Sequence, residues 1–102
     1  MNYMEAIFEF VNIDKSNNLE AFTQKKLNKI ENKYDWVVRA NVYFKKDENQ
    51  KPNGHIAEIR LSAPGPEIFA QSNESSFEAA VAETVSDLER QCGKRKAKMS
   101  TH

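Results

Sequence analysis

The chain has little of what disulfide-bonded, metal-binding or membrane-spanning proteins require. Its single cysteine, Cys92, excludes an intramolecular disulfide and a cysteine-based zinc cluster. The two histidines, His55 and His102, have no carboxylate or cysteine at metal-ligand spacing. No stretch approaches the roughly 20 apolar residues that span a bilayer, and Met1–Phe10 lacks the basic cluster and apolar run of a secretory signal. We therefore expect a cytoplasmic protein without metal ligands or membrane contact.

Sequence motifs of catalysis are missing as well. The chain has no phosphate-binding loop, dinucleotide glycine fingerprint or nucleophile elbow. Pro64-Gly65-Pro66 is expected to be a turn, because its two prolines remove amides that a phosphate cradle needs. Cys92 lies on an apolar helical stripe and is expected to be a small core residue; the alternative is a reactive thiol activated by Arg90 and Lys94. We expect no enzyme activity, no cofactor and no small-molecule substrate.

Charge is balanced overall but sorted along the chain. Fifteen basic and fifteen acidic residues give a net charge of zero. Segment 74–89 carries five acidic residues and no basic ones, whereas segment 90–98 carries five basic residues and no acidic ones. On one helix this split suits the macrodipole, so helix stabilisation alone would explain it. The other interpretation is a polyanion site, because five cations in nine residues exceed what a helix end needs.

Hydrophobic periodicity predicts one α+β domain over residues 1–102. The expected order is β-α-β-β-β-α, a four-stranded mixed sheet with two helices packed on one face. A helix between the first two strands allows that pair to be parallel, and short links make the rest an antiparallel meander. The expected strands are Met4–Ile13, Trp36–Lys46, His55–Ala63 and Glu67–Ser72, and the helices run from Asn17 to about Asp35 and from Ser75 to about Lys98.

Two sequence details set the expected helix ends. Asn17 with Glu20, and Ser75 with Glu78, have the spacing of capping boxes and are predicted to open the two helices. Gly93 costs a helix on the order of 1 kcal/mol against alanine, so we expect fraying or an end near it.

Charges on the first helix are also sorted. Its lysines fall on one flank of the apolar stripe, and Glu20, Glu31 and Asp35 fall on the other. If the two helices lie side by side, both basic sets form one surface that contacts phosphates. The alternative, solvated helix faces with dipole-matched ends, is equally compatible with the charges. The candidate RNA-binding residues are Lys25, Lys26, Lys29, Lys33, Arg90, Lys94, Arg95, Lys96 and Lys98.

Several runs, in order, resemble the ribosome hibernation promoting factor family, also called ribosome-associated inhibitors. The likeness covers nearly the whole chain. It rests on 26–31 (KLNKIE) with Tyr34-Asp35, on Glu67-Ile68, on Ala79-Ala80-Val81, and on Leu88, Arg90-Gln91, Lys94-Arg95-Lys96 and Lys98. Three departures are Trp36 in place of a frequent arginine, Ala82 in place of an acidic residue, and Cys92-Gly93 within the basic helix.

The resemblance implies a function. Family members fold as β-α-β-β-β-α, bind rRNA of the small ribosomal subunit through basic residues of both helices, and silence idle ribosomes by excluding mRNA and tRNA. It implies Lys26, Lys29, Arg90, Lys94, Lys96 and Lys98 most directly as contacts. It also implies a short form, without the second domain that pairs ribosomes, and a monomer when off the ribosome. A protein-interaction domain that kept the fold without ribosome binding is the alternative.

Overall fold

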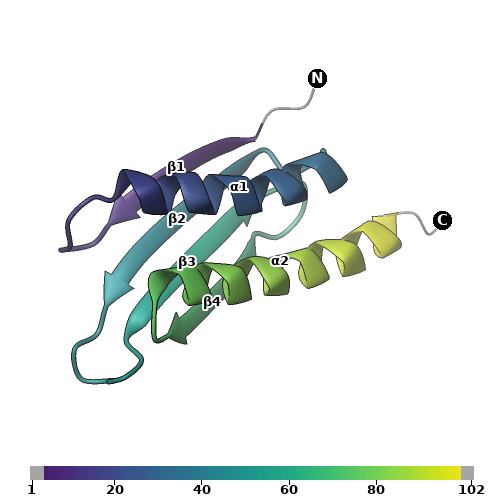
Figure 1. Ribbon diagram of the computed structural model, residues 1–102. Helices are drawn as coiled ribbons and strands as arrows, with labels where there is room; N and C mark the ends of the chain where they lie inside the picture. The colour runs from purple at the N-terminus through teal and green to yellow at the C-terminus, as the bar shows by residue number, and fades with distance from the viewer. Residues whose placement is uncertain (1–3, 100–102) are drawn as a thin grey trace.

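The computed structural model of the chain describes residues 4–99 as a four-stranded sheet covered on one face by two helices (Figure 1). The observed order confirms the predicted β-α-β-β-β-α arrangement. The elements are β1 (Glu5–Phe10), α1 (Asn17–Lys33), β2 (Arg39–Lys46), β3 (His55–Ser62), β4 (Ile68–Glu74) and α2 (Phe77–Met99).

The sheet is mixed, with strand order β1-β2-β3-β4. β1 and β2 are parallel because α1 returns the chain to the end of the sheet at which β1 begins. The other two pairs, β2–β3 and β3–β4, are antiparallel. In Figure 1, α1 lies over β1 and β2, and α2 over β3 and β4. This packing leaves the second face of the sheet without a helix.

The core lies between the helices and the sheet. The alternation predicted for β2 and β3 is observed, with Val42, Phe44, Ile59 and Leu61 all at most 1% exposed. The apolar stripes of the two helices supply the helix side of the core, where Leu27 of α1 is fully buried.

Two buried threonines on the helices were not expected from hydropathy. Thr23 Oγ1 donates to the carbonyl of Leu19 at 2.8 Å, and Thr84 Oγ1 donates to the carbonyl of Ala57 at 3.2 Å. Each hydroxyl is therefore satisfied inside the core, which removes most of the cost of burying it.

Both predicted helix caps are wrong by one residue. Ser16 caps α1 from an extended backbone (φ −126°, ψ 112°), and its Oγ accepts from the amide of Leu19 at 3.1 Å. Ser76 Oγ accepts from the amide of Ala79 at 3.1 Å, so it, not Ser75, opens α2. In each case two adjacent residues can cap, and the path of the preceding chain decides between them.

Three predicted strand ends also differ from the structure. β1 stops at Phe10, because Asn12 has a left-handed φ of 58°. β2 starts only at Arg39, because the amide of Val37 donates to the carbonyl of Tyr34 in a turn. That turn buries Val37 and leaves Val38 57% exposed, whereas the alternation along 36–46 predicts Val38 on the apolar side with Val42 and Phe44, so this prediction is wrong. β4 continues two residues beyond Ser72, to Glu74.

The expected break near Gly93 is absent, and α2 is continuous to Met99. Cys92 is fully buried, and Arg95 Nη1 donates to the carbonyl of Pro64 at 3.2 Å, so the last turns are held by the core and by the β3–β4 connection. These contacts offset the low helix propensity of Gly93. The basic residues beyond it therefore project from a rigid helix.

Candidate nucleic-acid interface

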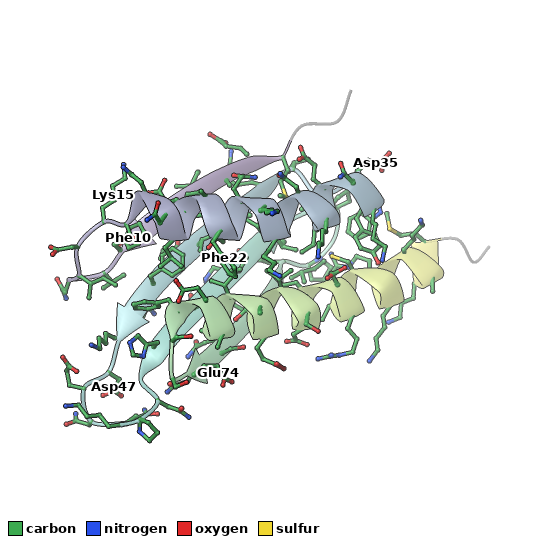
Figure 2. The ribbon with its side chains drawn as sticks, viewed as in Figure 1. Phe10, Lys15, Phe22, Asp35, Asp47 and Glu74 are labelled. Carbon is green, nitrogen blue, oxygen red and sulfur yellow. The ribbon has the colours of Figure 1, made fainter. Side chains whose placement is uncertain are left out.

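The two helices run in the same direction, and their C-terminal ends lie at the same end of the molecule (Figure 1). In Figure 2, Asp35 marks the end of α1 beside the last turns of α2, while Lys15 and Asp47 lie at the opposite end. Since most of the candidate cations belong to the C-terminal halves of the helices, they gather at one end. This placement also complements the negative ends of both helix dipoles.

The lysine flank of α1 faces α2. Lys33 Nζ lies 4.0 Å from the Glu89 carboxylate of α2. On the opposite flank, Glu31 accepts from the backbone amide of Met4, beside β1, at 2.7 Å. The two charged flanks of α1 therefore have different neighbours: Glu31 lies toward β1 and Lys33 toward α2.

Tyr34 lies between the two basic helix ends, a position that the sequence did not predict. The side chain is 6% exposed, and both Lys33 Nζ and Lys96 Nζ lie 5.9 Å from the centre of its ring. The negative face of an aromatic ring attracts cations, which helps to hold both there. Gly93 lies beside the ring, and a Cβ at this position would lie 3.5 Å from the Tyr34 hydroxyl, in ordinary van der Waals contact. Trp36 packs on Tyr34 with ring centres 5.6 Å apart.

The other α1 lysines lie roughly one to three helical turns before Tyr34. Lys25 and Lys29 are exposed, and Lys26 is half-buried with its Nζ 5.5 Å from the Phe22 ring centre. On α2, exposed Arg90 donates to Asp87 at 2.6 Å. The Arg90 charge is therefore partly neutralised by its own helix, whereas Lys25 and Lys29 present theirs to solvent.

Three candidate residues lie on the other side of α2. Lys94, Arg95 and Lys98 line a shallow pocket with Gln91, next to the turn that joins β3 to β4. The structure thus brings Lys96 together with the α1 lysines but places these three on the opposite flank. Helical periodicity could have predicted this division, because residues two positions apart, such as Lys94 and Lys96 or Lys96 and Lys98, lie roughly 160° apart around the helix axis.

Other candidate chemistry is not supported by the geometry. The pKa of the Cys92 thiol is raised to about 11, mainly by burial, with Arg95 acting to lower it and Glu89 to raise it. The reactive-thiol alternative is therefore wrong. His55 packs edge-on against Phe77 with ring centres 4.9 Å apart, and His102 lies outside the described residues. Among residues 4–99, His, Cys, Asp and Glu form no group of three that would hold a metal ion. No helix in the described part of the chain is long and apolar enough to cross a membrane.

The helix-free face of the sheet carries a separate charge network. Glu58, 6% exposed, accepts from Lys45 Nζ at 2.9 Å and from Arg60 Nε at 3.0 Å. Burial raises the pKa of the Glu58 carboxyl, but the two hydrogen bonds outweigh it, and the net pKa lies below its usual value. Arg60 also bonds Glu67, so the cations of this face are matched by carboxylates. Tyr43 is half-buried here.

The described residues thus form an α+β domain whose two helices carry cations toward one end. The chain belongs to the family described as sigma 54 modulation protein / S30EA ribosomal protein, which matches residues 6–100. This is a ribosome-associated hibernation and interface family of non-enzymatic modulators.

Solved structures show the same fold. A ribosomal subunit interface protein from Coxiella burnetii superposes with a TM-score of 0.82 at 26% identity, covering 92% of this chain and 99% of that one. The N-terminal domain of Thermus thermophilus Protein Y superposes with a TM-score of 0.75 at 21% identity, covering 92% and 98%. Comparison with curated protein sequences gives no significant match.

Proposed function

We propose that this protein binds the small ribosomal subunit through rRNA phosphates and blocks mRNA and tRNA, silencing translation in the cytoplasm. The observation that carries the proposal is the gathering of cations at one end of the helix layer, where Lys33 and Lys96 converge on Tyr34. Membership of the family and the similarity to a ribosomal subunit interface protein support it.

The mechanism is occlusion. The domain measures 48 × 25 × 18 Å, which suits a compact plug in an RNA-lined channel. Lysine and arginine contacts to phosphates fix such a plug by geometry without reading base identity. No catalytic residue is needed, because the monomer acts by occupying space.

Sedimentation with isolated ribosomal subunits tests the proposal. The variant K25E/K29E/K96E reverses three exposed cations, two on α1 and one on α2. Its matched control, K15E/K46E/K51E, changes net charge by the same amount with exposed lysines from the other end of the domain. Wild type and control should sediment with the small subunit, and the affinity of wild type should fall steeply with salt. The helix variant should bind weakly, with a salt slope smaller by roughly 2–3, because about one counterion is released per phosphate contact.

Two results would contradict the proposal. Equal loss in the helix variant and the control would show that net charge, not this site, governs binding. Absence of wild-type binding at low salt would favour the alternative of a protein-interaction domain with the same fold. Circular dichroism of each variant separates lost binding from lost folding.

A further inference from the structure

The first strand, β1, has a neighbouring strand on one side only. In the strand order β1-β2-β3-β4 it forms one edge of the sheet, and β4 forms the other (Figure 1). The amide of Glu5 donates to the carbonyl of Val38 at 3.1 Å, so the odd-numbered residues of β1 pair toward β2. In an extended strand the N–H and C=O of one residue point the same way, and this direction alternates along the chain. The backbone groups that point away from the sheet are therefore those of Ala6, Phe8 and Phe10.

The two edges of the sheet differ in what covers them. Among residues 4–99, no hydrogen bond outside the β1–β2 ladder reaches the outward backbone groups of β1. On β4, by contrast, the carbonyl of Phe69 accepts from Gln91 Nε2 of α2 at 2.8 Å. A row of unpaired N–H and C=O groups can pair with another extended chain. The β1 edge is therefore the one open to an added strand.

A hollow lies beside this edge, between β1 and the first half of α1. It has a volume of about 330 Å³ and is lined by Phe8, Asn17, Glu20, Ala21 and Gln24. That volume is several times the ~30 Å³ of a water molecule in the liquid, so an aliphatic side chain fits. Residues that lie opposite each other on paired strands share a face of the sheet, so alternate side chains of an added strand would enter the hollow. The edge thus offers both backbone pairing and side-chain contacts.

The side chains around the β1 edge are mostly acidic. Glu5 and Glu9 are exposed on the helix-free face, and Glu20 lies in the hollow on the other face. Two cations reduce this charge: Arg39 Nε lies 3.3 Å from the Glu5 carboxylate, and Lys15 Nζ lies 3.9 Å from that of Glu20. Within residues 4–99, Glu9 makes no ion pair. An excess of negative charge therefore borders the edge.

These carboxylates oppose pairing with a second copy of the chain. In an antiparallel pair of β1 strands about Ile7, Glu5 of each copy would lie directly opposite Glu9 of the other. Like charges directly opposite each other destabilise a sheet, whereas opposite charges stabilise it. Charged residues on an edge strand commonly prevent unwanted pairing, and here their sign favours a partner strand that carries cations.

We propose that the β1 edge binds an extended basic segment of a protein partner, which adds a fifth strand to the four-stranded sheet. Its cations lie toward Glu5 and Glu9, and its apolar side chains enter the hollow. This site is on the flank of α1 that carries Glu31, whereas Lys33 marks the flank toward α2. A partner on β1 therefore leaves the lysine flank of α1 free. The inference does not depend on RNA binding, because it uses other residues and another edge of the domain.

The first test uses a short capped peptide that alternates lysine and valine, with hydrogen exchange as the measurement. In the free protein the amides of Ala6, Phe8 and Phe10 should exchange rapidly, and saturating peptide should protect them. The amides of Ile7 and Glu9, which pair with β2, should be protected in both states and serve as the internal control. A matched peptide that alternates glutamate and valine should not bind.

Charge reversal on the protein tests the selection by sign. E5K/E9K should weaken binding of the lysine–valine peptide by about tenfold or more, because two cross-strand pairs change from attraction to repulsion. The same variant should bind the glutamate–valine peptide. Its matched control, E48K/E83K, changes net charge equally with exposed acids in the β2–β3 loop and on α2. The control should bind the lysine–valine peptide as wild type does.

Alternate N-methylation of the peptide tests backbone pairing without changing charge. In an antiparallel pair the valine amides face β1, and in a parallel pair the lysine amides do. Methyl groups on one of these two sets should therefore abolish binding, while methyl groups on the other set leave it intact. Binding of both methylated peptides would overturn the inference.

Two further results would overturn it. One is equal loss of affinity in E5K/E9K and E48K/E83K, which would show that net charge alone governs binding. The other is protection of the outward β1 amides in the free protein; protection that rises with protein concentration would assign the edge to a second copy. Failure of the proposed function would appear separately, because K25E/K29E/K96E should still bind the peptide and E5K/E9K should still sediment with the small subunit.

Discussion

Replacing Gly93 by alanine should stabilise the protein, although this glycine lies where the two helices meet. The backbone there is helical, and a Cβ would lie 3.5 Å from the Tyr34 hydroxyl, an ordinary van der Waals distance. Alanine therefore gains helix propensity without a clash. The propensity difference is about 1 kcal/mol, and tertiary contacts reduce it, so we expect a gain of roughly 0.5–1 kcal/mol.

Urea unfolding measures this gain. With an m-value of about 1–2 kcal/mol/M, the midpoint should rise by roughly 0.3–1 M while the m-value stays constant. Gly93→Val provides the contrast, because its Cγ atoms extend beyond the permitted Cβ into Tyr34. Overpacking of this kind costs about 1–3 kcal/mol, so the valine variant should be less stable than wild type. A destabilised Gly93→Ala variant would refute the reasoning, since it would mean that Tyr34 cannot accept even one methyl group.

Three further predictions concern buried polar groups. At pH 8 the Cys92 thiol should react with a disulfide reagent at least about 100-fold more slowly in folded than in urea-unfolded protein, because a pKa of about 11 against 9.0 lowers the thiolate fraction by that factor. Glu58→Gln should cost about 1 kcal/mol in urea unfolding at pH 7, discounted because its partners are partly exposed. The carboxyl pKa is lowered by folding, so this stabilisation exists above its ordinary value of 4.5 and is lost as pH falls through the folded value; the gap between the two proteins should narrow at pH 3. Thr84→Val should lower stability by about 1 kcal/mol, measured in the same way, because an isosteric side chain removes one buried hydrogen bond.

The order and layering of the elements could be predicted because the patterns are strong. The strands β2 and β3 have one apolar face, and each helix has one apolar stripe. Packing the helices on one face of the sheet buries both kinds of apolar surface. Thr84 escaped prediction for a physical reason: its hydroxyl is satisfied by the carbonyl of Ala57 on another element. No local pattern records such a partner. Val38 was misplaced because the turn at Tyr34 shifts the phase of the alternation before β2 begins.

For the candidate site, the sequence predicts only which basic residues share a flank of each helix. A helical wheel separates Lys96 from Lys94 and Lys98, but it does not say which neighbour each flank meets. The neighbour of each flank depends on the position at which the chain passes from β4 into α2. It also depends on the turn at Gly65, which places the carbonyl of Pro64 within hydrogen-bond distance of Arg95. Whether Lys94, Arg95 and Lys98 contact RNA stays a prediction.

Zero net charge does not argue against a polyanion partner for this chain. At physiological ionic strength the field of a charge decays over about 8 Å. The domain is 48 Å long, and Asp47 and Glu74 lie away from the basic end of α2 (Figure 2). Under the proposed function, RNA bound at Lys25, Lys29 and Lys96 would therefore be influenced little by the acids at the other end. A local gathering of cations would then be enough to bind a phosphate-lined site, although the net charge of the chain is zero.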